Sequence, residues 1–201
     1  MPTNPLPLSF GNYYHIFNRG NNRENIFIQE RNYSYFMELW WKYTFQIAET
    51  YAYCLLRNHF HAVVFVKREE DVTGFENLSG HKFIQPSQYF ANLFNAYTRG
   101  VNNATQRTGA LFERPFERLR VTNEAYLMRL IIYIHQNPQK HNFVKDFCDW
   151  NYSSYHDLIF EPQTRLQRDK VLEMFGGREN FIRLHQEIQP SDFADEYDDQ
   201  T

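Results

Sequence analysis

Two histidines, His59 and His61, flank a phenylalanine in a segment whose composition is typical of a β-strand. Side chains alternate along a strand, so both imidazoles share one face and Phe60 points to the other. The opposite face is wholly apolar and carries Phe60, Ala62, Val64 and Val66. We predict that the imidazoles lie on the exposed face of a central strand and bind one divalent cation, the alternative being a face covered by another helix. Two ligands do not define a metal site, and a plain pair of hydrogen-bonded histidines has the same spacing.

A helix predicted over residues 123–137 supplies groups that complement the histidine pair. Tyr133 and Asn137 are four residues apart and therefore share a face of that helix. The Asn137 amide oxygen can act as a third, hard metal ligand. Tyr133 lies one turn earlier, where its hydroxyl can approach a phosphate polarised by the metal. Taken alone, Tyr133 is equally compatible with an ordinary core tyrosine.

These residue types together suit the cleavage of a phosphodiester. A divalent cation held by His59, His61 and Asn137 would polarise the phosphate and offset charge in the transition state. A tyrosine nucleophile forms a phosphotyrosine linkage that keeps the bond energy for rejoining. The phenol has an ordinary pKa of about 10, so it needs activation by a metal or a base. Imidazole and amide ligands with open positions suit Mg or Mn, and imidazoles also hold Zn or Ni.

The distribution of charge is compatible with a nucleic-acid partner although the net charge is -3. Residues 99–140 carry seven Lys or Arg against three Glu, whereas five of the last ten residues are acidic. Local clustering matters more than the total for phosphate binding, although ordinary surface arginines produce the same pattern. We expect DNA contacts from the polar residues around Gly20, in 114–120 and just past the tyrosine helix. They are Asn18, Arg19, Arg114, Arg118, Arg120, Lys140 and His141.

The predicted elements that position these groups follow the order strand, helix, strand, strand, helix, strand, helix. The ranges are 12–19, 31–47, two strands within 50–66 joined at Arg57-Asn58, 87–101, 111–121 with an irregularity at Pro115, and 123–137. The last helix is expected to end at Asn137, because a proline disfavours helical geometry in the residue before it. Residues 67–85 are polar and predict a loop. The order predicts an α+β fold whose first six elements match a ferredoxin-like antiparallel sheet with helices on one face.

The chain divides into three predicted parts. Residues 1–160 form the catalytic domain, 161–187 a C-terminal helical extension interrupted at Gly176-Gly177, and 188–201 an acidic tail that is expected to be disordered. The two cysteines are far apart in the sequence, which favours a reducing compartment. We expect no signal peptide at the N-terminus and no membrane span, because the sequence has no apolar run long enough for one. We therefore expect a cytoplasmic, nucleoid-associated protein.

Several segments resemble the REP-associated tyrosine transposases, relatives of the single-tyrosine HUH transposases of small insertion sequences. The segments are YHIFNRG at 14–20, LRNHFHAVV at 56–64, GALFERPF at 109–116, YIHQNPQKH at 133–141 and WNYSSY at 150–155. They span about residues 13–156. HFH alone is unspecific, but HFH followed at this distance by YIHQNP is specific.

The resemblance implies the HUH endonuclease version of the ferredoxin-like sandwich, with both histidines on a central strand. It implies metal ligation by His59, His61 and Asn137, a nucleophilic Tyr133, and a substrate of single-stranded DNA beside a hairpin formed by an imperfect palindrome. Insertion-sequence transposases commonly have Gln where Asn137 stands, and the REP-associated group has Asn. Relatives are monomers or homodimers, and the sequence does not choose between them.

Three other functions remain open from the sequence. A domesticated protein would bind hairpin DNA without moving it, although His59, His61, Tyr133 and Asn137 are all present. An RNA-binding ferredoxin-like module would carry aromatic residues where the histidines stand. A phosphoesterase with two HxT or HxS motifs is disfavoured, because there is one HxH.

Overall fold

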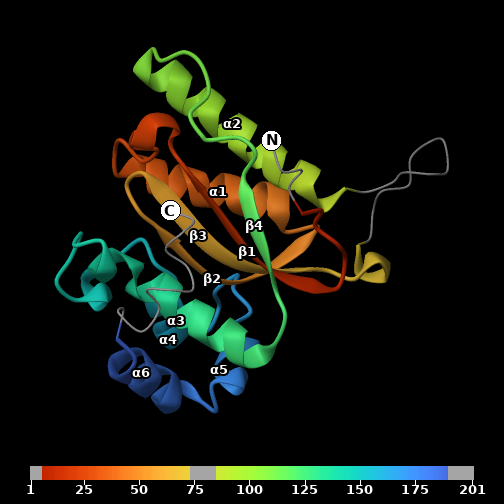
Figure 1. Ribbon diagram of the computed structural model, residues 1–201, viewed down its shortest axis with the longest axis vertical. Coiled ribbons are helices and arrows are strands. Elements are labelled where there is room, and N and C mark those ends of the chain that lie inside the picture. Colours follow the sequence, from red (N-terminus) through yellow and green to blue (C-terminus); the bar gives the residue numbers. More distant parts are fainter. Residues whose placement is uncertain (1–5, 73–84, 190–201) are drawn as a thin grey trace.

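A computed structural model describes residues 6–72 and 85–189. It contains a four-stranded antiparallel sheet in the order β2-β3-β1-β4 (Figure 1). The strands are β1 (Asn12–Arg19), β2 (Ala48–Leu55), β3 (His59–Val66) and β4 (Glu117–Val121). Helices α1 (Arg31–Thr44) and α2 (Pro86–Thr105) connect them as β1-α1-β2-β3-α2-β4. The α+β class, the ferredoxin-like order and the central position of β3 are therefore confirmed.

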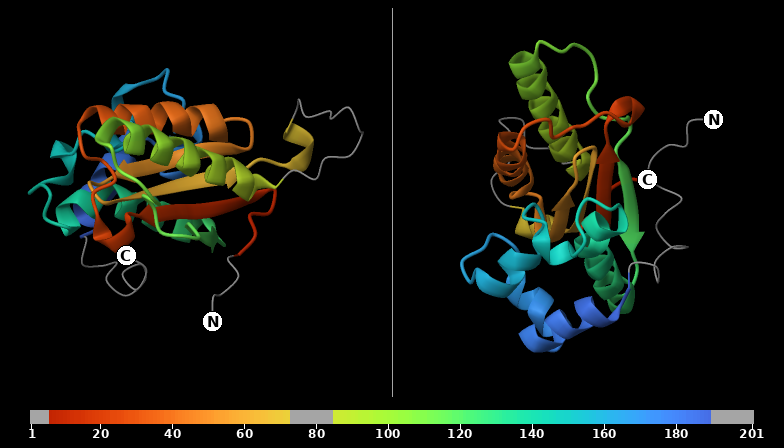
Figure 2. Two further views of the ribbon diagram at one scale, coloured as in Figure 1. Left: turned by 90° about the horizontal axis from the view of Figure 1, so that it is seen from above. Right: turned by 90° about the vertical axis from the view of Figure 1, so that its left-hand side faces the viewer.

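One face of the sheet packs against α1 and α2, which lie side by side (Figure 2). Alternation along β3 places Phe60, Ala62, Val64 and Val66 in this core, as the apolar pattern predicts. From the helices, Phe36, Trp40, Phe90 and Tyr97 are fully buried against them. This core fixes the orientation of β3, because a shift of one residue would turn its apolar face outward.

The opposite face is covered by α3 (Glu124–Lys140), which packs mainly on β2 and also contacts β3 and β4 (Figure 1). Its apolar side joins a second core that includes Val63 of β3. Three short helices follow and pack into the same core: α4 (Tyr155–Phe160), α5 (Arg168–Met174) and α6 (Arg178–Glu187). The sheet is thus enclosed between two helical layers. None of the helices in the described ranges has the length and hydrophobicity to cross a membrane.

The helix that carries Tyr133 continues to Lys140, so the predicted end at Asn137 was wrong. Pro138 removes one backbone donor, but the following turn is held by hydrogen bonds from the His141 N–H to the Asn137 carbonyl (3.0 Å) and from the Phe143 N–H to the Pro138 carbonyl (2.9 Å). Asn123 caps the other end by accepting a hydrogen bond from the Tyr126 N–H.

Other predicted boundaries also differ from the structure. The strand predicted over 111–121 is regular only in β4, since Pro115 cannot donate to a ladder, and Phe112 forms an isolated bridge with Gly20. Short 3-10 turns stand at Asn21–Arg23, Glu69–Asp71 and Phe147–Asp149. The Phe147–Asp149 turn and α4 were not predicted. Residues 73–84 of the predicted loop and 190–201 of the predicted acidic tail lie outside the described residues.

Candidate active site

The histidine pair begins β3, and each ring is oriented by a hydrogen bond through its Nδ1 atom. His59 Nδ1 lies 2.8 Å from the Asn58 side-chain oxygen. His61 Nδ1 lies 2.9 Å from Nε2 of His15, a residue of β1. The two rings are 5.2 Å apart between centroids. When Nδ1 carries the proton, Nε2 keeps a lone pair, so Asn58 and His15 leave both Nε2 atoms able to ligate a cation.

The buried atoms on this side of the sheet that have no hydrogen-bond partner among the described residues include Nε2 of His59, Nε2 of His61 and Oδ1 of Asn137. Buried polar atoms without partners are costly, and a bound cation would satisfy all three. The described residues contain no group of three or more His, Cys, Asp or Glu placed to hold a metal. The donor set that fits a cation here is therefore two imidazoles and one amide oxygen, with remaining positions for water or substrate.

Helix α3 brings Tyr133 and Asn137 over the histidines. The Tyr133 ring centroid lies 5.8 Å from that of His61, and the His141 ring lies 5.1 Å from that of His59. Lys140 Nζ is 5.0 Å from the centre of the Tyr133 ring. The structure thus collects the tyrosine, the amide and the imidazoles in one place, together with two of the predicted DNA contacts.

This face of β3 is not exposed, so the predicted exposed face was wrong. His61 and Tyr133 are each 1% exposed, and Asn137 is fully buried. The reason is that α3 packs directly on the sheet and its apolar side joins the second core. A phosphate can reach the Tyr133 hydroxyl only after the groups that cover it move.

Burial keeps the histidines neutral. It lowers the pKa of His59 to about 3, with a smaller contribution from His141, while contact with Asn137 opposes the shift. Burial also lowers the pKa of His15 to about 3 and that of His61 well below its ordinary value. Neutral imidazoles are the form that can ligate a metal.

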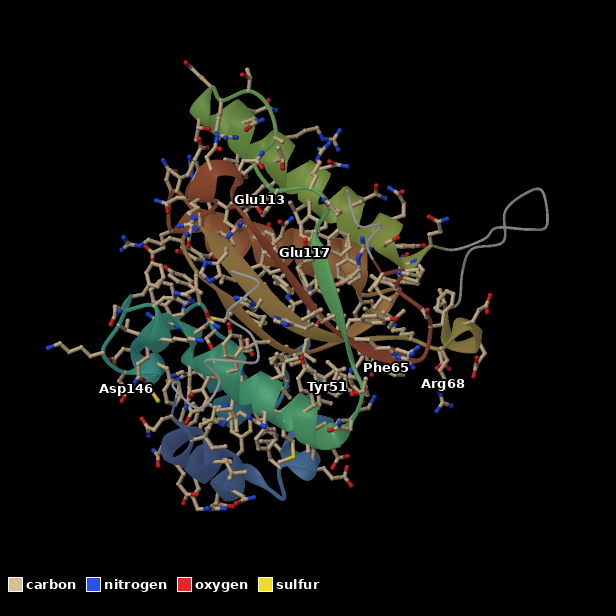
Figure 3. All side chains as sticks on the ribbon, in the orientation of Figure 1. Tyr51, Phe65, Arg68, Glu113, Glu117 and Asp146 are labelled. Carbon is tan, nitrogen blue, oxygen red and sulfur yellow. The ribbon has the colours of Figure 1, made fainter. Side chains whose placement is uncertain are left out.

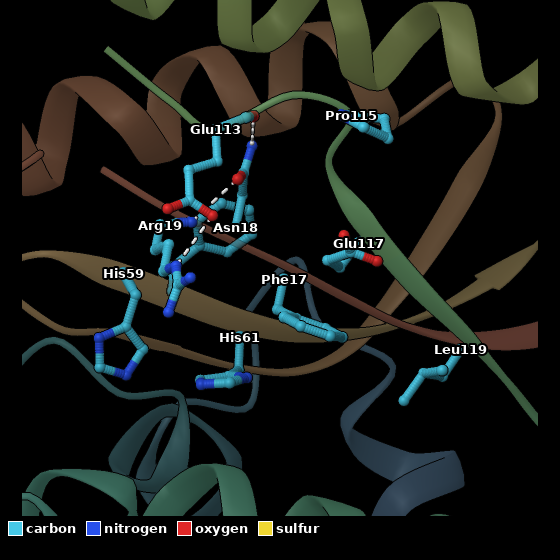
Figure 4. A pocket seen from close by; sticks show the side chains of 10 residues that line it. Phe17, Asn18, Arg19, His59, His61, Glu113, Pro115, Glu117 and Leu119 are labelled. Atoms are coloured by element: carbon cyan, nitrogen blue, oxygen red, sulfur yellow. Dashed lines mark hydrogen bonds and ion pairs between the residues drawn. The ribbon is translucent and has the colours of Figure 1, made fainter. Parts of the chain in front are cut away.

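A cavity of about 440 Å³ opens beside the two histidines (Figure 4). Its other walls include Phe17, Arg19 and two acidic residues, Glu113 and Glu117. Figure 3 shows Glu113 on the segment before β4 and Glu117 at the start of β4. The Arg19 side chain pairs with Glu113 at 2.8 Å. Since both side chains of this pair are about one-third exposed, Arg19 can exchange Glu113 for a phosphate at little cost.

The remaining predicted DNA contacts are distributed over a wider surface. Asn18 is buried, donates to the Glu113 carbonyl at 3.2 Å and accepts from the Arg19 N–H, so it shapes the pocket wall. Arg114 and Arg118 line a different cavity, next to α2. Arg120 is exposed on β4. Within this set, Arg19, Lys140 and His141 are close to the histidines.

Four residues near the site were missed from the sequence: His15, Asn58, Glu113 and Glu117. His15 meets His61 because β1 pairs with β3 in a register that sets Phe17 opposite His61, which makes His15 its diagonal neighbour on the same face. No local signal in the sequence gives that register. Asn58 is adjacent to His59 in the chain, and an amide beside a candidate ligand was a signal that could have been used.

Comparison with known proteins supports the resemblance stated above. No family model matches the chain. A Haemophilus influenzae protein provisionally named a REP-associated tyrosine transposase is 27% identical over 109 residues, which is 54% of this chain. The match spans 59% of that relative's length. The structure of a REP-associated tyrosine transposase bound to a REP hairpin superposes with a TM-score of 0.61 and 17% identity, covering 82% of this chain and 88% of the other. The relative therefore confirms the resemblance to this family, and the superposed structure confirms the fold.

Proposed function

We propose that this chain is a metal-dependent single-strand DNA endonuclease and transposase that cleaves and rejoins DNA beside a hairpin. Tyr133 is the proposed nucleophile, and His59, His61 and Asn137 are the proposed metal ligands. The observation that carries the proposal is the convergence of Tyr133 with three buried atoms that lack hydrogen-bond partners. Hairpin DNA is the proposed substrate because the superposed transposase was solved with a REP hairpin.

In the proposed reaction, the Tyr133 oxygen attacks the scissile phosphorus and loses its proton. A new bond joins this oxygen to phosphorus while the bond to a deoxyribose oxygen breaks, and that oxygen leaves as a hydroxyl. Attack by a strand's hydroxyl on the phosphotyrosine reverses the step and rejoins DNA. A bound Mg or Mn would polarise the phosphate and offset its charge.

The chain's own groups have separate tasks in this scheme. His15 and Asn58 hold the two imidazoles with Nε2 available. Arg19, at the edge of the histidine cavity, can bind a flanking phosphate in exchange for Glu113. Lys140, close to the Tyr133 ring, supplies positive charge beside the developing phenolate. Burial strengthens the interactions of the histidines and Tyr133, because the local dielectric around them is low.

The burial of Tyr133 favours a second candidate, a domesticated protein that binds hairpins without cutting them. A tyrosine that is 1% exposed is also what an ordinary core position contains. An RNA-binding module of the open-sheet type fits less well, because helices among the described residues cover both faces of the sheet.

A gel assay for covalent adducts separates cleavage from binding. Labelled single-stranded hairpin DNA is incubated with Mn and with either the wild-type protein or one of the variants Tyr133→Phe, Tyr126→Phe and Tyr152→Phe. The products are then separated on a denaturing gel. Phe fills nearly the volume of Tyr, so Tyr133→Phe should keep its fold and hairpin binding but lose both the nick and the shifted band. Tyr152, which stacks on Tyr33 and hydrogen-bonds Glu30, should be dispensable for the adduct.

The outcomes lead to different conclusions. No adduct from the wild-type chain, with hairpin binding intact, would favour the domesticated protein. An adduct that persists in Tyr133→Phe and disappears in Tyr126→Phe or Tyr152→Phe would show that the nucleophile is assigned to the wrong residue.

A further inference from the structure

A second cavity, of about 560 Å³, lies across the segment 113–117 from the histidine cavity. Asn18, Glu113 and Pro115 line both cavities. Alternation then separates the walls, because Glu117 and Leu119 face the histidine side, whereas Phe116 and Arg118 face the side of α2. A single DNA strand that crosses this segment could therefore occupy both cavities.

Arg118 is the notable group in this second cavity, which we call the α2 cavity. Arg118 is 9% exposed, and its buried Nε atom has no hydrogen-bond partner among the described residues. The guanidinium carbon lies 4.2 Å from the centre of the Phe116 ring. Burial lowers the pKa of Arg118, which nonetheless stays protonated. A buried, charged N–H donor without an acceptor is costly unless a ligand provides one.

The other walls of the α2 cavity define the class of ligand. Arg114 adds a second positive charge and donates to the Asn95 side-chain oxygen at 3.2 Å. The acidic wall residue, Glu113, is already paired with Arg19. Asn95 and Gln88 offer amides, and Phe116 offers a ring. Positive charge suits a phosphate, whereas amides and an aromatic ring suit the edge and face of a base. Together they match a nucleotide, and the volume is in the range of small-ligand sites.

We propose that the α2 cavity holds one unpaired nucleotide of the DNA substrate, next to the nucleotide whose phosphate enters the histidine cavity. The Arg118 guanidinium and Phe116 ring grip this nucleotide, and Asn95 and Gln88 contact its polar edge. The inference rests on the proposed function, since it assumes that DNA is the substrate. It adds a site on the opposite face of the sheet from the proposed metal ligands.

Binding measurements with a matched pair of oligonucleotides test this site without requiring cleavage. Both oligonucleotides contain the palindromic hairpin that lies nearest to the gene encoding this protein. One has unpaired flanks and the other has none. Fluorescence anisotropy in EDTA measures their affinities for the full chain. Wild-type protein should bind the flanked hairpin more tightly. Arg118→Met should reduce affinity for the flanked hairpin about tenfold, the loss expected for one base contact, and leave the bare hairpin unchanged.

Control variants distinguish a nucleotide grip from general electrostatic attraction. Arg120→Met removes the same charge two residues along the same strand, from an exposed position outside the α2 cavity, and should have little flank-specific effect. The Arg118→Lys variant should lose the flank preference as Arg118→Met does, because a lysine side chain lacks the planar guanidinium that stacks on Phe116. Asn95→Ala, at an exposed position, gives a second test if Arg118→Met fails to fold. It should reduce the flank preference in the same direction.

Photo-crosslinking places the flank directly. Iododeoxyuridine in the unpaired flank should crosslink to peptides from 87–98 or 110–118. Crosslinks confined to other peptides would overturn the proposal, as would equal loss in Arg118→Met and Arg120→Met or full rescue by Arg118→Lys. A wild-type chain that binds both hairpins equally would also overturn it while leaving hairpin recognition intact. Conversely, flank binding through Arg118 without any covalent adduct would uphold this site and refute only the proposed cleavage.

Discussion

His15 gives the sharpest test of how the histidine pair is held. Its Nε2 atom lies 2.9 Å from Nδ1 of His61, and the two side chains are 2% and 1% exposed. If His61 ligates a cation through Nε2, its Nδ1–H must donate to His15. We predict that His15→Phe removes this acceptor, leaves the His61 N–H buried without a partner and frees the ring to turn.

The size of the effect follows from that geometry. An orphaned buried donor costs about 1–3 kcal/mol. Loss of an outer-shell partner of a ligating histidine typically weakens metal binding by about 10–100-fold, or about 1.4–2.8 kcal/mol. The two ranges agree, so we expect the Kd for Mn to rise by about one to two orders of magnitude in His15→Phe.

Calorimetric titration of Mn into the DNA-free protein measures this directly. His15→Gln is the matched rescue, because its amide oxygen can accept from the His61 N–H and should recover most of the affinity. His185→Gln is the control for losing a buried histidine, since His185 also bonds another histidine at 2.8 Å but lies on α6. It should lower the urea midpoint without changing the Kd for Mn.

Two results would refute this reasoning. A folded His15→Phe protein with wild-type affinity for Mn would show that His15 does not orient the ligand. Equal loss in His15→Phe and His15→Gln would show that packing beside Phe17, rather than the hydrogen bond, is what matters.

Three further predictions concern the metal, the acidic tail and pH. His59→Ala should abolish Mg- or Mn-dependent cleavage, and full activity in metal-replete buffer would remove the metal site from the proposal. Truncation after Gln189 removes five acidic residues and should keep or slightly increase DNA affinity, most visibly at low salt; a large loss of binding or of folded protein would contradict this. Burial lowers the pKa of His185 to about 3, so its contribution to stability is complete above its unfolded pKa of about 6.5 and is lost as pH falls toward 3. The free energy of unfolding, measured in urea, should drop by about 2 kcal/mol for this residue alone between pH 7 and pH 5, and an equal drop in a folded His185→Gln variant would refute the assignment.

Local periodicity was sufficient for much of the fold and for the main site residues. The period of two in 59–66 correctly put both histidines on one face and the apolar residues on the other. The spacing of four between Tyr133 and Asn137 correctly put them on one side of α3. These inferences hold because side-chain direction within one element depends on backbone geometry alone.

Local rules failed where packing competed with them. The preference against helix before a proline predicted an end at Asn137, but the buried turn around Pro138 continues to Lys140. The polar histidine face was expected to be open, yet α3 covers it because its own apolar side needs the second core. In both cases the free energy of burying α3 exceeds a local preference of the chain.

The sequence by itself therefore determined which side chains share a face, and the tertiary structure decided which faces meet. Strand register brought His15 against His61, and the strand's alternation sent Arg118 into the α2 cavity while Arg19 stayed beside the histidines. Arg19, Arg114 and Arg118 look alike in the sequence, but their partners are Glu113, Asn95 and the Phe116 ring. The physical reason is that such contacts join residues far apart in the chain, so they depend on register and packing that no local pattern encodes.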